Sequence, residues 1–110
     1  MNIIGHSLRI IDQRDNCFHL KTGLKLTASV SCDIRKAIKA CANQAWDYIY
    51  LDAKEVIRID LGGVNEVIHS YYTLKQISKK LVLVYRIDSP VEHWVKTAGL
   101  DKFIETAIVR

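Results

Sequence analysis

The stretch that most constrains the fold runs from residue 48 to residue 67, where a strand-like run leads into a helix-like pattern. The run opens with Tyr-Ile-Tyr-Leu, a set of aromatic and branched aliphatic residues that suits a buried strand. A short connection follows and ends at Asp60. The apolar positions beyond it are spaced by three, one and three residues, as on one face of a helix: Val64, Val67, Ile68 and Tyr71. We therefore expect a strand, a connection and a helix whose N-cap is Asp60.

Two glycines, Gly62 and Gly63, occupy the first turn of this expected helix. A glycine inside a helix is up to ~1 kcal/mol less favourable than alanine, so the pair needs a physical reason. Glycine leaves bare backbone at a helix N-terminus. Either another group approaches very closely there, or the entry turn has unusual backbone dihedrals.

This order of strand, aspartate, glycines and helix resembles the STAS domain family. That family includes the anti-anti-sigma factors of bacterial partner switching and the cytoplasmic domains of sulfate transporters. Its pattern at this point is Asp-Ser-Ser/Thr-Gly-Leu, and residues 60–64 here are Asp-Leu-Gly-Gly-Val. Residues 80–84, Lys-Leu-Val-Leu-Val, look like the family's fourth strand, and residues 95–104, Val-Lys-Thr-Ala-Gly-Leu-Asp-Lys-Phe-Ile, look like its closing signature. The resemblance covers nearly the whole chain.

The resemblance and the patterning together predict one α/β domain over residues 1–110. We expect a STAS-like mixed, mostly parallel sheet of about five strands flanked by three or four helices. The expected strands are residues 7–12, 17–20, 48–51, 81–85 and 107–109. The first two should form a hairpin that adds an antiparallel edge. The continuous apolar run at 81–85 suggests a strand with helices on both faces.

Helix boundaries are marked unevenly along the chain. The firmest start is Ser89, an N-cap followed by Pro90 and by Glu92 in a capping box, and that helix should stop at Gly99. The helix after Asp60 should run to about residue 78. An earlier helix should follow a loop at residues 24–29, and its candidate caps compete with one another: Ser29, Ser31 and Asp33.

One departure from the STAS pattern bears directly on function. In the switching members, the residue after the aspartate is a serine that a kinase phosphorylates. A phosphate there adds about −1.5 to −2 charge at the interface and breaks the complex. Here that position is Leu61, which has no hydroxyl. We therefore expect a module that either binds its partner permanently or is regulated at another residue.

The resemblance implies a protein partner, such as an anti-sigma factor with a kinase-type fold, that docks on the helix start and the neighbouring loop. The expected contact residues are Lys25, Thr27, Asp60, Leu61, Gly62, Gly63, Asn65 and Glu66. One alternative is a STAS-like accessory subunit of an ABC lipid-transport system, which would bind its ATPase. Another is a small ligand or nucleotide held by Gly62-Gly63, although the lysine and hydroxyl of a P-loop are missing.

The sequence offers little catalytic chemistry, and we expect no enzyme activity, no cofactor and no metal site. The four histidines lack metal-ligand spacing, and Asp52 and Asp60 are the carboxylates placed at expected strand ends. For Asp60, helix capping is a sufficient role. The three cysteines, an odd number without a C-x-x-C pair, are expected to be small buried residues in a reducing compartment.

Charge and hydropathy narrow the partner classes. The net charge of +4 is spread along the chain rather than gathered on a dense basic face, which argues against nucleic acid. No run approaches 18 apolar residues, so no membrane span is expected. The first residues lack the basic and apolar regions of a signal peptide, so a cytoplasmic location is expected.

Overall fold

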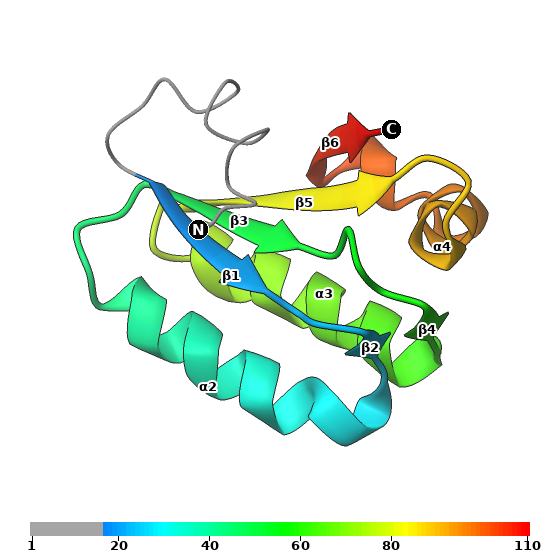
Figure 1. Cartoon of the computed structure of the whole chain (residues 1–110). Coiled ribbons are helices and arrows are strands. Elements are labelled where there is room, and N and C mark those ends of the chain that lie inside the picture. The colour runs from blue at the N-terminus through cyan, green and yellow to red at the C-terminus, as the bar shows by residue number, and fades with distance from the viewer. Residues whose placement is uncertain (1–16) are drawn as a thin grey trace.

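A main sheet of four parallel strands organises the part of the chain that the computed structural model describes, residues 17–110 (Figure 1). The strand expected at residues 7–12, and the hairpin it would form, lie outside these residues. The strands stand in the order β1-β3-β5-β6. Their bounds are Cys17–Lys21 for β1, Tyr48–Asp52 for β3, Lys80–Arg86 for β5 and Glu105–Val109 for β6. The expected α/β class is confirmed, with four strands in this sheet.

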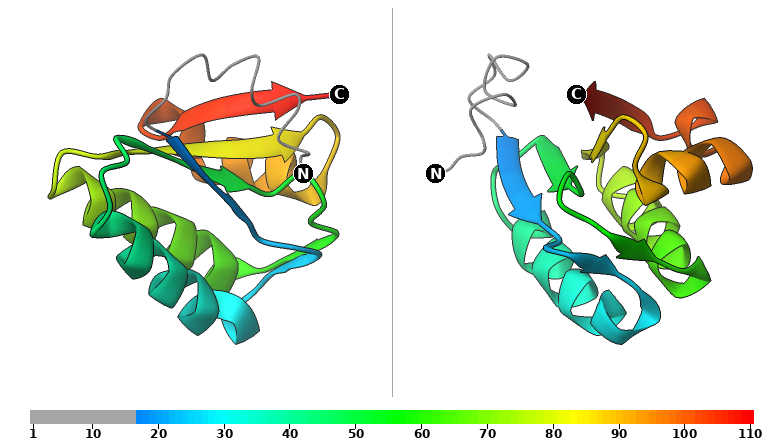
Figure 2. Two further views of the ribbon diagram at one scale, coloured as in Figure 1. Left: turned by 60° about the vertical axis from the view of Figure 1, so that its left-hand side comes forward. Right: turned by 45° about the vertical axis from the view of Figure 1, so that its right-hand side comes forward.

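Three α-helices connect consecutive strands of the main sheet. They are α2 (Ser31–Ala42), α3 (Leu61–Lys75) and α4 (Pro90–Ala98). The two views of Figure 2 show them on the same side of the sheet. Strands in sequential order, joined by crossovers of one hand, carry their helices to one face. The prediction that β5 has helices on both faces is therefore wrong for residues 17–110.

The alternation of side chains along the strands divides the core between the two faces of the sheet. On the helical face, Ile49 and Leu51 of β3 and Leu81, Leu83 and Tyr85 of β5 pack with the buried residues of all three helices. On the other face, Tyr50, Val82 and Val84 form a second buried cluster. The His19 ring stacks on Tyr50 there, with centroids 5.1 Å apart, which supports packing rather than catalysis for this histidine.

A second, two-stranded parallel sheet extends the β1–β3 pair toward the start of α3. It consists of β2 (Lys25–Leu26) and β4 (Arg58–Ile59), and the Ile57 amide donates to the Leu24 carbonyl at 2.8 Å beside it. Residues 24–29 are therefore not the simple loop expected from the sequence. They form β2 and then the 3₁₀ turn η1 (Ala28–Val30).

The ends of α2 and α3 differ from the expected ones. No side chain caps α2, because η1 runs directly into it and the Ser31 amide donates to the Ala28 carbonyl. The cap prediction for Ser29, Ser31 and Asp33 is therefore wrong. α3 stops at Lys75, before the expected residue 78, because Ser78 adopts a left-handed φ of 63°.

The boundaries of α4 are as predicted. The Ser89 hydroxyl accepts from the Glu92 amide at 3.2 Å, Pro90 is the first helical residue, and Gly99 ends the helix with a φ of 68°. The Glu92 carboxylate accepts from the Asp88 amide at 2.9 Å, one residue before the cap. None of the helices within residues 17–110 is both long and apolar enough to cross a bilayer.

Candidate functional site

Asp60 caps α3 and also holds a second segment of the chain. Its Oδ1 accepts from the Gly63 amide at 2.9 Å and from the Ala28 amide, in η1, at 3.0 Å. The N-cap prediction is confirmed. The additional bond fastens η1 against the start of α3, so one carboxylate satisfies donors from two elements that are distant in sequence.

The two glycines are needed because another part of this chain crosses them. A Cβ on Gly63 would lie 1.8 Å from the Leu26 carbonyl oxygen, and one on Gly62 would lie 2.5 Å from the Ala28 Cβ. The first alternative raised by the sequence, a very close approach, is thus correct. However, the approaching group is β2 and η1, not a visitor. The Gly63 amide is already donated to Asp60, so this backbone offers no open cradle for a phosphate.

Thr27 faces inward, so the prediction that it contacts a partner is not supported by its position. It is 7% exposed, because the chain turns toward the core between β2 and η1. Its hydroxyl shares a 2.8 Å hydrogen bond with the Ser29 hydroxyl. The Ser31 hydroxyl lies 3.4 Å from both the Thr27 and Gly62 carbonyl oxygens, which ties this turn to α3. Thr27 therefore supports the surface from below and does not form part of it.

Glu66, another of the expected contact residues, is buried in α3, with 2% of its surface exposed. α2 packs beside α3, and Arg35 from α2 reaches over the carboxylate. Arg35 Nη2 donates to Glu66 Oε1 at 2.8 Å and Arg35 Nε to Oε2 at 3.4 Å. The hydrogen bond and charge of Glu66 raise the pKa of the Arg35 guanidinium. Glu66 thus joins two helices and is not available to a partner.

The expected contact residues that remain on the surface are Lys25, Asp60, Leu61 and Asn65. Leu61 is 59% exposed, and two further large aliphatic side chains at this end of the molecule are equally open: Leu24 at 58% and Ile57 at 70%. We call Leu24, Ile57 and Leu61 the apolar trio. The hydrogen bond from Ile57 to Leu24 holds the first two as neighbours, and β4 leads from Ile57 to the start of α3 (Figure 1).

Sequence reasoning missed Leu24 and Ile57. Leu24 lies between Gly23 and Lys25 in a polar turn, which is an unusual place for a leucine and was the available signal. Ile57 follows Val56, and the sequence does not say which of the two faces inward. The structure buries Val56 at 3% exposure and leaves Ile57 open.

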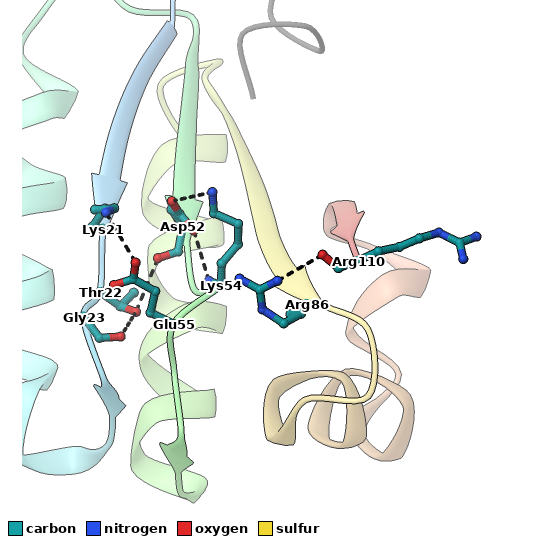
Figure 3. A network of polar contacts seen from close by, with 8 residues as sticks. All are labelled: Lys21, Thr22, Gly23, Asp52, Lys54, Glu55, Arg86 and Arg110. Carbon is teal, nitrogen blue, oxygen red and sulfur yellow. Dashed lines mark hydrogen bonds and ion pairs between the residues drawn. The ribbon is translucent and has the colours of Figure 1, made fainter. Parts of the chain in front are cut away.

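Asp52, the other carboxylate at a strand end, has a local structural role (Figure 3). It is 3% exposed at the end of β3, and its Oδ1 accepts from the Lys54 amide at 3.0 Å. Its Oδ2 lies 3.7 Å from Lys54 Nζ. An aspartate that bonds the amide two residues on closes a turn. Asp52 and Asp60 make separate sets of contacts and form no carboxylate pair.

Metal ligands and cysteines within the described residues add no functional group to the candidate site. In residues 17–110, no group of three histidine, cysteine or acidic side chains is placed to hold a metal ion. Cys32 and Cys41 are free thiols, and Cys17 is half-buried on β1. Burial raises the pKa of the Cys41 thiol, whereas Cys32 is exposed, so the expectation of buried cysteines is wrong for Cys32.

No protein-family model matches the chain, and no curated protein matches it.

Proposed function

We propose that this chain is a STAS-like, non-enzymatic protein–protein interaction module, located in the cytoplasm, whose docking surface is the apolar trio. The observation that carries the proposal is the exposure of Leu24, Ile57 and Leu61, each at 58% or more, at one end of the molecule. Scattered single apolar side chains are normal on a surface. A group of large ones on adjoining segments is typical of an interaction site.

The segments that carry the apolar trio are held in place by hydrogen bonds, as a preformed docking surface requires. Asp60 bonds both η1 and α3, and β2 pairs with β4, so the segments that carry the three side chains are held together before any partner arrives. Binding a partner then costs this chain little conformational entropy, because the surface is already ordered. Lys25 and Arg58 are exposed beside the trio, which favours a partner with acidic groups around an apolar centre.

Leu61 also bears on whether phosphorylation can control binding in this proposal. It occupies the position of the STAS phosphoserine and is largely open to solvent, so it contributes apolar contact where a switching member would carry its hydroxyl. The complex is therefore constitutive with respect to phosphorylation at this position. The partner is an anti-sigma factor of kinase-type fold in the primary form of the proposal. The ATPase of a lipid-transport system is the alternative partner.

The proposal is tested with Ile57→Glu and Leu61→Glu, which place a charge in the trio. Glutamate in the first turn is favourable for the α3 dipole, so Leu61→Glu should leave the helix intact. The matched control is Ile108→Glu, because Ile108 is a 52% exposed aliphatic residue on β6, away from the trio.

The measurement has two stages. Proteins retained from the source cell by wild type, but not by either trio variant, are identified by mass spectrometry. The purified partner is then titrated by calorimetry. We expect at least about a tenfold loss of affinity for both trio variants, since burying an unpaired charge at an interface is unfavourable, and no change for Ile108→Glu. Equal binding by all four proteins would refute the docking surface. The identity of the partner separates the sigma-factor and transport alternatives.

A further inference from the structure

A cavity of about 470 Å³ lies at the opposite end of α3 from the apolar trio. α3 has 15 residues, so the two sites are separated by roughly 22 Å along the helix. The cavity lies between the C-terminal end of α3, the start of β5 and the start of β6, and its volume is within the range of small-molecule sites. Its lining includes two aromatic residues, three lysines and one glutamate: Tyr71, Phe103, Lys75, Lys79, Lys80 and Glu105.

The apolar part of the lining can receive a flat molecule. The Tyr71 and Phe103 rings meet edge to face, with centroids 5.3 Å apart and an interplanar angle of 75°. Phe103 remains 39% exposed, and Leu81 beneath is 2% exposed. Exposed aromatic surface beside a buried aliphatic residue favours a planar apolar ligand, because a ring can stack on or abut the two aromatic side chains.

The charged part of the lining favours an anion. Lys75 Nζ lies 5.7 Å from the Tyr71 ring centroid, and Lys80 Nζ lies 6.0 Å from that of Tyr48. Among residues 17–110, neither ammonium group forms an ion pair with a carboxylate. The dipole of α3 accounts for Lys75 at its last turn but not for Lys80, which belongs to β5. Glu105 opposes an anion, and it is a single charge against Lys75 and Lys80.

Hydrogen bonds fix the turn between Lys75 and Lys80, so this wall of the cavity is preformed. Ser78 takes its left-handed φ of 63° there, and the Lys79 amide donates to the Leu74 carbonyl at 2.9 Å. The Lys79 ammonium group donates to the carbonyls of Gln44, at 2.9 Å, and of Trp46, which fixes this turn to the chain beyond α2. A rigid cavity lowers the entropy lost on binding.

We propose that this cavity binds a small aromatic anion, a planar ring that carries a sulfonate, carboxylate or phosphate group. The ring lies against Phe103 and Tyr71, and the anionic group lies beside Lys75 at the end of α3, toward the start of β5 where Lys80 also lines the cavity. This site is independent of the proposed docking surface, and either can fail without the other.

The test compares an aromatic anion with its neutral counterpart. The probes are 8-anilino-1-naphthalenesulfonate and N-phenyl-1-naphthylamine, titrated into the full chain at neutral pH and followed by fluorescence. We expect saturable one-to-one binding of the sulfonate. Lys75→Gln with Lys80→Gln should weaken sulfonate binding by about tenfold and change binding of the amine by less than about twofold, because the amine makes no charge contact. Phe103→Ala should weaken both probes.

Two further variants separate the cavity from general surface charge. Glu105→Gln should tighten sulfonate binding by about twofold or more, since it removes the opposing charge. Lys36→Gln with Lys39→Gln, on the exposed side of α2, makes the same change in net charge as the cavity pair and should leave binding unaltered. Leu61→Glu should also leave it unaltered. Equal weakening by the two lysine pairs, loss of binding in Leu61→Glu, or a non-saturable signal would each overturn the proposal.

Discussion

Gly63 shows how a residue can be required by a contact that its own neighbourhood in the sequence does not reveal. The Gly-Gly pair indicates that something approaches closely, and it does. The approaching group, the Leu26 carbonyl, comes from β2, and nothing near residue 63 in the sequence identifies it. Glu66 is a second case. Nothing near it in the sequence shows that it is buried, and it is buried because α2 packs beside α3 there.

Gly63→Ala should therefore destabilise the fold by overpacking. Its Cβ would meet backbone at 1.8 Å, and a carbonyl held in a β2–β4 pair cannot rotate away as a side chain could. We expect a loss of about 3 kcal/mol in unfolding free energy, measured by urea denaturation.

The control for this prediction is Gly23→Ala. Gly23 has a left-handed φ of 81° with no atom within 4 Å of an added Cβ, so its penalty comes from the backbone conformation alone. We expect about 1 kcal/mol there. A Gly63→Ala variant no less stable than Gly23→Ala would contradict the close approach of Leu26.

At the scale of elements, prediction succeeded where the signals are local. The sequence Ser-Pro-Val-Glu at 89–92 and Gly99 together define both ends of α4, because capping depends on residues within one turn. β3 and β5 are equally clear from their continuous apolar runs. The start of α2 could not be predicted from its candidate caps, since a preceding 3₁₀ turn supplies its first hydrogen bond from the backbone. The exposure of Leu24 and Ile57 could not be predicted either, because it depends on how the β2–β4 pair folds against α3.

The contact between α2 and α3 gives a prediction about paired charges. Arg35→Gln should destabilise the protein, because it leaves the Glu66 carboxylate buried, with 1% of its side chain exposed, without its cation. The additional change Glu66→Gln should restore part of the loss, since a neutral amide is less costly to bury than an unpaired charge. The measurement is the urea midpoint of the three proteins at neutral pH.

The matched control for this pair is Lys96→Gln. Lys96 is 70% exposed and lies 3.8 Å from Glu92 on one face of α4. An exposed i,i+4 pair contributes little, so its shift in midpoint should be several times smaller than that of Arg35→Gln. Equal shifts would show that Glu66 is not dependent on Arg35.

At the scale of the whole molecule, two buried acids predict how stability responds to alkaline pH. Burial raises the pKa of the Cys41 thiol and is also the largest cause of the raised pKa of Tyr85. The unfolded chain therefore releases these protons at lower pH than the folded chain. Unfolding free energy should fall as pH rises above about 8.5, first through Cys41 and then, near pH 10, through Tyr85.

Cys41→Ala should flatten the first part of this decline and Tyr85→Phe the second. The measurement is the urea midpoint of each protein at intervals between about pH 7.5 and about pH 10.5. Cys32→Ala is the control, because it removes a cysteine whose side chain is exposed rather than buried. A decline with the same shape in all four proteins would place its origin in other groups.

The sequential order of the main sheet has a consequence for synthesis. Each strand pairs with the next one along the chain, as in Cys17 with Tyr48, Tyr48 with Lys80, and Val82 with Glu105. These pairings join residues that are 31, 32 and 23 positions apart, so the entropy of closure is similar and modest at each step. A ribosome-bound chain can add one strand and one helix at a time to what has already formed. β6 is added last, after every other strand of the sheet has found its neighbour.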